Sequence, residues 1–197
     1  MATARPSPRR PGRPIEARPR EAAIQATLDL VAEHGIRGLT TNAVAERAGI
    51  SKATMYRRWR SKEELMLDAV ASLVGEIAVP NTGSFAGDVR ALLRNAVKLY
   101  ADDRPSQLFP HLVGEMARNP ALAEAVRSGF LAQRRSALCA IVERGRARGE
   151  LRPEVDTELC LDLFAGVIYY RFLITGGPLT RRVADDLADV IVRGVAT

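Results

Sequence analysis

The chain has 197 residues, 47% of them hydrophobic and 26% charged, with a formal net charge of +6. This length allows one large or two small domains with a substantial core, and the longest apolar run, 163–170, is too short to span a bilayer. Two cysteines, Cys139 and Cys160, are too few for a disulfide framework or a metal site. We therefore expect a cytoplasmic protein with no secretory signal, no cofactor, no metal and no membrane partner.

Positive charge is concentrated in the first third of the chain. Residues 1–60 hold twelve Lys or Arg and five Asp or Glu, a net of +7, so residues 61–197 hold 17 against 18, a net of −1. Such an asymmetry indicates that one end of the chain meets a polyanion, and nucleic acid is the first candidate.

Residues 1–18 are rich in Arg and Pro and almost devoid of apolar side chains, which predicts a disordered basic arm. Two interpretations fit this composition equally well. The arm either follows a DNA minor groove or phosphates, or it serves as a solubilising tail.

Apolar spacing and capping residues predict four helices after the arm. Their expected boundaries are Glu21 to the glycine at 35, Thr40 to the glycine at 49, Lys52–Trp59, and a last helix opened by the capping box of Ser61 and Glu64. Two short helices joined by a glycine turn, the second of them basic, are typical of a helix-turn-helix.

The segment Lys52–Trp59 separates apolar from basic side chains when it is placed on a helix. At about 100° per residue, Met55 and Trp59 fall on one side, and Ala53 and Arg57 fall on the other. If the side with Met55 and Trp59 is buried, the opposite side exposes a small side chain followed by a basic one. Such a surface suits a DNA major groove. The alternative is an ordinary solvated basic helix.

Each exposed side chain of this segment has an expected role on DNA. Ala53 could contact a thymine methyl group, and Arg57 could bind guanine through two hydrogen bonds. Phosphate contacts are expected from Lys52, Thr54, Tyr56, Arg58 and Lys62, the last in the first turn of the next helix, where free N–H groups attract phosphate.

A turn-rich segment, "VPNTGS", separates the front of the chain from the rest. We therefore divide the chain into an arm (1–18), a helix-turn-helix domain with a linking helix (19–79) and a C-terminal domain (80–197). Five more helices are predicted in the last part: Phe85–Ala101, Ser106–Arg118, Pro120–Arg148, Asp156–Thr175 and Leu179–Val195. No segment alternates with a period of two, so the fold class is all-α with about nine helices.

Enzymes with common nucleotide, metal or nucleophile motifs are not supported, because the chain has no glycine-rich phosphate loop, no HExxH and no GxSxG.

Residues 20–70 resemble the DNA-binding domain of the TetR/AcrR family of bacterial transcriptional regulators. The resemblance rests on "TLDLVAEHGIRGLTTNAVAERAGISKATMYRRWRSKEELM". It implies nine or ten helices, a dimer formed through the last two long helices, and an effector pocket in the C-terminal domain. It also implies DNA contacts at Thr41, Lys52, Ala53, Thr54, Tyr56 and Lys62. The chain departs from the family pattern with Arg58, where His is frequent, and Arg60, where Pro is common.

Apolar faces of the last two helices provide the expected dimer interface, which would be a four-helix, two-fold contact. Its residues are Leu159, Leu163, Val167, Tyr170, Val183, Leu187, Val190 and Ile191. The alternative is that these faces form an ordinary core within one chain. Candidates for effector binding are Tyr100, Phe109, His111, Met116, Phe130, Phe164 and Tyr169, each of which could equally be a core residue.

These observations favour a ligand-responsive repressor that binds a pseudo-palindromic operator as a dimer and is released by a small-molecule effector. Two alternatives stay open at this point. One is a constitutive dimeric DNA-binding protein without effector, and the other is a helical small-molecule-binding protein with an incidental basic face.

Overall fold

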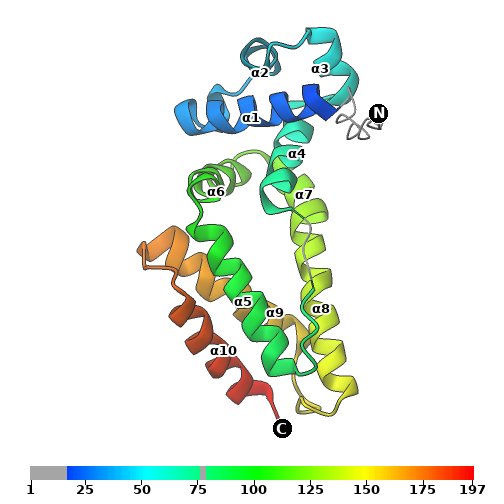
Figure 1. The fold of residues 1–197 in the computed structure, drawn as a ribbon, viewed down its shortest axis with the longest axis vertical. Helices are drawn as coiled ribbons and strands as arrows, with labels where there is room; N and C mark the ends of the chain where they lie inside the picture. The colour runs from blue at the N-terminus through cyan, green and yellow to red at the C-terminus, as the bar shows by residue number, and fades with distance from the viewer. Residues whose placement is uncertain (1–16, 76–78) are drawn as a thin grey trace, which may run out of the picture.

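A computed structural model describes residues 17–75 and 79–197, and over these residues the protein is helical (Figure 1). The segments α7, η2 and α8 run on without a break, as do α9 and η3, so the described residues form nine continuous helices. Their one extended pairing is an isolated bridge between Leu151 and Ala196. The all-α prediction is therefore confirmed, whereas the predicted arm lies, up to residue 16, outside the described residues. None of the helices in the described ranges is long and apolar enough to cross a bilayer.

The front of the chain folds into a compact group of helices at the top of Figure 1. Its elements are α1 (Ala17–His34), the 3-10 turn η1 (Ile36–Gly38), α2 (Thr41–Ala48), α3 (Lys52–Arg58) and α4 (Lys62–Val74). α1 packs against both α2 and α4, and α4 then leads down to the rest of the molecule.

Local chemistry explains where these helices begin. The hydroxyls of Thr40, Ser51 and Ser61 accept hydrogen bonds from backbone N–H groups in the first turns of α2, α3 and α4, as their N-cap positions predict. Between α2 and α3, Gly49 has φ 65° and ψ 30°, a left-handed conformation that costs glycine nothing. The turn that orients α3 is thus specified by adjacent residues.

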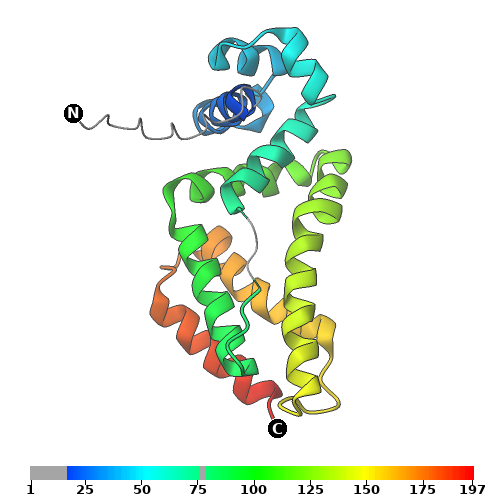
Figure 2. The ribbon, with the colours of Figure 1, turned by 45° about the vertical axis from the view of Figure 1, so that its right-hand side comes forward.

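The C-terminal part is a bundle built from six α-helices and two π-helical segments. Its elements are α5 (Phe85–Ala101), α6 (Asp103–Met116), α7 (Pro120–Val126), η2 (Arg127–Leu131), α8 (Ala132–Ala147), α9 (Thr157–Tyr169), η3 (Tyr170–Thr175) and α10 (Arg181–Val195). Figure 2 shows α7, η2 and α8 as one long rod on one side of the bundle, with α5 and α10 on the other. This rod agrees with the single helix predicted from Pro120.

Three predicted helix starts were wrong, and side-chain caps explain two of them. α1 begins at Ala17 instead of Glu21, so it includes the last two residues of the predicted arm. α6 begins at Asp103 instead of Ser106, because Asp102 caps it and Pro105 lies in the first turn, where its missing N–H costs nothing. α10 begins at Arg181 instead of Leu179, because Thr180 accepts a hydrogen bond from the Val183 N–H.

The two parts of the molecule touch through α1, η1 and α4. α1 and η1 lie on α6, while α4 contacts α6, α7 and η2. One polar link in this contact is the side-chain amide of Asn119, which donates to the Glu63 carboxylate at 3.1 Å. The linking helix therefore belongs structurally to both parts.

Candidate DNA interface and ligand cavity

The helix α3 is fixed to the front domain by its apolar side. Met55 is fully buried and Trp59 is 4% exposed, which confirms the orientation predicted from the helical spacing. The Trp59 indole N–H donates to the Asp68 carboxylate at 3.1 Å, and the Arg20 Nε donates to the same oxygen at 3.0 Å. α3 is thus held by packing and by a polar network that includes α1 and α4.

The opposite side of α3 faces solvent. Its exposed residues are Lys52, Ala53, Tyr56, Arg57 and Arg58. The Tyr56 hydroxyl lies 3.0 Å from the Thr41 hydroxyl, so α2 and α3 present these two side chains together. Thr54 is half-buried, and its hydroxyl lies 2.9 Å from the capping hydroxyl of Ser51. Lys62 is half-buried at the start of α4.

The charges on this face are left without acidic partners. In the described part of the chain, neither Lys52 nor Arg57 forms an ion pair, and the Arg58 guanidinium lies 5.7 Å from the centre of the Trp59 ring. Arg47 behaves differently, since it donates two hydrogen bonds of 2.8 Å to Glu33 and thereby lowers the pKa of that carboxyl. Unpaired cations on a protruding helix can attract the phosphates of a nucleic acid.

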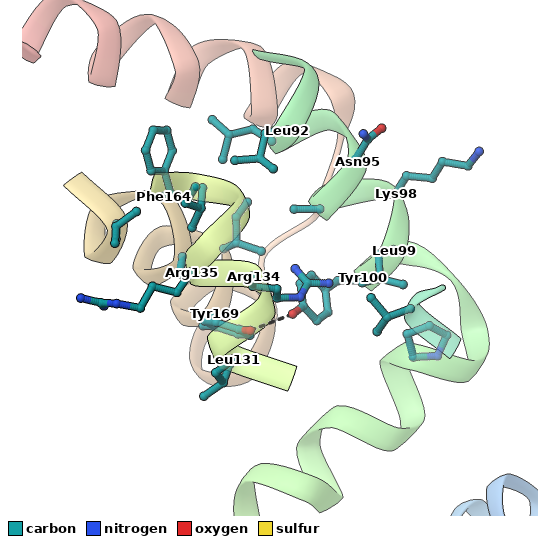
Figure 3. A pocket seen from close by; sticks show the side chains of 18 of the residues that line it. Leu92, Asn95, Lys98, Leu99, Tyr100, Leu131, Arg134, Arg135, Phe164 and Tyr169 are labelled. Atoms are coloured by element: carbon teal, nitrogen blue, oxygen red, sulfur yellow. Dashed lines mark hydrogen bonds between the residues drawn. The ribbon is translucent and has the colours of Figure 1, made fainter. Parts of the chain in front are cut away.

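A cavity of about 760 Å³ lies inside the C-terminal part. Its wall combines the end of α4, the second half of α5, η2 with the first turns of α8, and α9. Most of the side chains on it are apolar, and Figure 3 shows the wall from close by. A volume of this size is typical of sites for small organic ligands, which occupy about 300–1,000 Å³.

Two tyrosines supply hydroxyl groups at this cavity. The Tyr100 hydroxyl donates to the Tyr169 hydroxyl at 2.9 Å (Figure 3). Burial raises the pKa of Tyr100 well above its usual range, and the neighbouring Tyr169 adds to this shift. Tyr100 therefore stays protonated.

Comparison with known proteins identifies the family. Residues 23–69 match the model of bacterial regulatory proteins of the tetR family, and residues 79–191 match the tetracyclin repressor-like C-terminal domain. The chain belongs to the TetR family.

Three similar proteins illustrate the relationship. The chain is 34% identical over 185 residues to YdeS, an uncharacterized HTH-type transcriptional regulator of Bacillus subtilis, and the match covers 93% of each chain. It is 31% identical over 183 residues to the DNA-binding transcriptional repressor TetR of Mycobacteroides abscessus, which covers 88% of this chain and 94% of the relative. The crystal structure of the TetR family regulator SCO0332 superposes with a TM-score of 0.70 at 30% identity, covering 91% of this chain and 99% of that one.

This TetR-family protein is a transcriptional regulator and not an enzyme, with a DNA-binding helix-turn-helix and a ligand-binding C-terminal domain. Of the seven residues that sequence reasoning assigned to effector binding, Tyr100, Phe164 and Tyr169 lie on the cavity wall.

The other four of those residues do not line this cavity. Phe109 and Phe130 are buried behind the wall, where Phe109 packs at 4.9 Å from the Tyr100 ring and 5.6 Å from the Phe130 ring. His111 is exposed on α6 next to Gly35, at the contact with the front domain. Met116, at the end of α6, is half-buried and does not line the cavity. An aromatic or polar residue in an apolar helix can face core, cavity or domain contact, and its spacing does not distinguish these.

The residues of the predicted dimer face in this TetR-family protein also differ in solvent exposure. Leu159, Leu163, Tyr170 and Val190 are exposed, and Val167 and Val183 are half-buried. Leu187 and Ile191 need correction, because both are buried in the contact of α10 with α5 inside the protomer. Ile174, which the sequence analysis left out, is the most exposed of the large apolar side chains that the structure describes, at 72%.

Sequence reasoning missed Arg134 on the cavity wall. This arginine lies three residues after Leu131 and four before Leu138, both of which also line the cavity. A charged residue at such spacing within an apolar stripe is the signal that could have identified it.

Proposed function

We propose that this TetR-family protein is a dimeric repressor that binds a pseudo-palindromic operator and leaves it when a small molecule fills the C-terminal cavity. The observation that carries the proposal is the orientation of α3, whose apolar side is buried while its unpaired cations face outward. The name of the Mycobacteroides abscessus relative, a transcriptional repressor, supports repression over activation.

On the operator, α3 enters the major groove, where Ala53 and Arg57 contact base edges. Contacts to phosphates come from the side chains around this ridge, which fix its position without reading sequence. These are Thr41, Lys52, Thr54, Tyr56, Arg58 and Lys62. The hydrogen bond between the Thr41 and Tyr56 hydroxyls supports this assignment, because it orients both groups on one surface.

Dimerisation places two copies of α3 in successive major grooves about 34 Å apart. The exposed apolar residues of α9, η3 and α10 form the contact: Leu159, Leu163, Tyr170, Ile174 and Val190, with Val167 and Val183 at its edge. Contiguous apolar side chains on a monomer surface mark such interfaces. The dimer would be contradicted if the wild type had the mass of one chain at micromolar concentration and Leu163→Glu left that mass unchanged.

The cavity is connected to the DNA-binding helix through α4. Leu73 and Val74, at the end of α4, line the cavity, and the same helix begins three residues after Trp59. A ligand that displaces the end of α4 therefore changes the position of α3 relative to its partner copy. Because a ligand shifts an equilibrium only through different affinities for the two states, the effector binds free protein more tightly than operator-bound protein.

The test of DNA binding uses genomic fragments selected by the full chain. The double variant Tyr56→Ala and Lys62→Ala removes four phosphate contacts from the dimer. It should weaken binding about 10,000-fold, since each lost hydrogen bond to a charged phosphate contributes about 1.5 kcal/mol. Because only Lys62 carries charge and the dimer holds two copies of it, the slope of log affinity against log salt should fall by about 1.8.

The matched control is Arg182→Ala, which removes a cation that is 89% exposed on α10. It should leave both affinity and salt slope unchanged. Unchanged DNA binding by the double variant, at preserved helicity, would refute the proposed interface.

A further inference from the structure

The cavity holds a cation whose charge nothing in the described chain balances. We propose that the cavity binds an amphipathic organic anion, whose headgroup is held by Arg134 and Tyr169 while its apolar body fills the space between α5, α8 and α9. This inference rests on the proposed function only in treating the cavity as the effector site.

Arg134 differs from several other arginines of the bundle, which form ion pairs. Arg127 also lines the cavity without an ion pair among the described residues, but it is exposed, whereas Arg134 is half-buried. Arg90 pairs with Asp189, Arg94 with Asp185, Arg135 with Glu158 and Arg144 with Asp88. The guanidinium of Arg134 makes no hydrogen bond or ion pair within the described residues, and its buried Nε has no acceptor. It lies instead 4.7 Å from the centre of the Phe130 ring and 5.7 Å from that of Tyr100.

A partly buried cation without a counter-charge is costly, because burial removes water that would otherwise solvate it. Two aromatic faces offset part of this cost but use none of the guanidinium hydrogen-bond donors. In Figure 3, the side chain of Arg134 lies beside Tyr100, whereas those of Arg135 and Lys98 point away from the tyrosine pair. Arg134 is thus the cation that a ligand meets next to the two hydroxyls.

The tyrosine pair adds a second donor at the same place. Because the Tyr100 hydroxyl donates a hydrogen bond to the Tyr169 oxygen, the Tyr169 hydroxyl can donate its own hydrogen bond to another acceptor. A hydroxyl that accepts one hydrogen bond while donating another is polarised and becomes a better donor. A guanidinium next to a hydroxyl donor fits a group that only accepts, such as a carboxylate.

The rest of the wall requires an apolar body. Leu92, Leu99, Leu131, Leu138, Phe164 and Ile168 line the cavity, which a small inorganic anion would leave largely unfilled. Two acidic side chains on the wall, Asp102 and Asp162, are exposed, so they stay solvated and screened from the headgroup. Charge recognition and apolar volume together point to an amphipathic ligand.

The test compares ligands that share an apolar body and carry either a charged or a neutral headgroup. Titration calorimetry with the full chain uses two matched pairs, dodecanoate with dodecanol and 2-naphthoate with 2-naphthol, below any micelle concentration. The wild type should bind at least one anion about tenfold or more tightly than its neutral partner, as expected for one charge-assisted hydrogen bond.

Variants assign this preference to one residue. Arg134→Gln should abolish the anion preference, and Arg134→Met, which keeps the packing against Phe130, should do the same. Arg134→Lys should retain part of it. Lys98→Gln is the matched control, since it removes an exposed cation from the cavity rim and should leave the preference unchanged.

The outcomes separate this inference from the repressor proposal. Equal binding of both members of each pair, a preference that survives both Arg134→Gln and Arg134→Met, or no binding of either anion would overturn it. If dodecanol or 2-naphthol binds as well as its acid and releases the operator, the effector-responsive repressor stands and the anion site fails.

Discussion

The front domain and the C-terminal bundle place their functional groups in opposite ways. In the front domain, the proposed DNA contacts lie within residues 41–62, on α2, α3 and the first turn of α4. The cavity wall, in contrast, collects side chains from residues 73 to 169, which belong to the six elements α4, α5, α6, η2, α8 and α9. A surface site can therefore be encoded by one local pattern, whereas a cavity depends on how distant helices meet.

The two regions also treat positive charge differently. Lys52 and Arg57 carry no acidic partner on the outer face of α3, whereas Arg94 and Arg144 in the bundle are paired with Asp185 and Asp88. Unpaired charge at an exposed surface costs little and attracts phosphate. On the cavity wall, Arg134 is a half-buried cation without an acidic partner among the described residues, and this makes the cavity electrostatically distinctive.

The largest expected effect is a loss of stability in the front domain, with the bundle left folded. Trp59→Ala removes a side chain that is 4% exposed and whose indole N–H donates to Asp68. It should destabilise the front domain by about 3–5 kcal/mol, because a large buried aromatic side chain is lost and a cavity remains. Chemical denaturation followed by circular dichroism would measure this loss.

Arg58→Ala is a suitable control for Trp59→Ala, because it removes the exposed neighbour that lies over the same ring. Its effect on unfolding should be much smaller. Equal stabilities of Trp59→Ala and wild type would show that the apolar side of α3 does not anchor the helix.

The second prediction concerns a charge that the bundle neutralises. Asp88 is fully buried on α5, where it accepts hydrogen bonds from the Thr82 backbone at 2.6 Å and the Arg144 guanidinium at 3.1 Å. Burial opposes its ionisation, but these hydrogen bonds outweigh burial and lower the pKa of Asp88. Asp88→Asn should therefore lower the free energy of unfolding by about 2–3 kcal/mol at neutral pH.

This cost should also depend on pH in a defined direction. A carboxyl whose pKa is lower in the folded state contributes its full stability above its unfolded pKa, about 3.9 for Asp, and loses it as pH falls through the folded value. The difference in free energy of unfolding between wild type and Asp88→Asn should be constant near neutral pH. It should shrink on acidification below about pH 4. A gap that widens on acidification would contradict the role given to Asp88.

The smallest effect is expected at the exposed ion pair of the front domain. Glu33→Gln breaks the two hydrogen bonds from Arg47, both of 2.8 Å. Because the pair is exposed, the midpoint of thermal unfolding should stay within the scatter of replicate measurements. The variant frees a cation, so affinity for DNA should rise slightly at low salt and not at high salt. A large loss of stability would show that this surface pair supports the fold.

Much of the front domain was predictable because its determinants are local. Thr40, Ser51 and Ser61 cap the helices that their positions predicted, and Met55 and Trp59 are buried together as their spacing required. The bundle was predicted as helical, but two helix starts were displaced, since Asp102 and Thr180 cap α6 and α10 instead of the positions just before Ser106 and Leu179. A cap competes with its neighbours, and a single sequence does not show which one wins.

The sequence by itself determined the helices, the turn between α2 and α3, and the basic face of α3, because hydrogen bonding and helical periodicity act over a few residues. Only the tertiary structure decided which apolar faces were inside. Leu187 and Ile191 turned toward α5, Leu163 and Val190 stayed exposed, and Arg134 met aromatic rings instead of a carboxylate. The physical reason is that an apolar stripe specifies burial but not a partner, so the partner is fixed only when distant helices pack together.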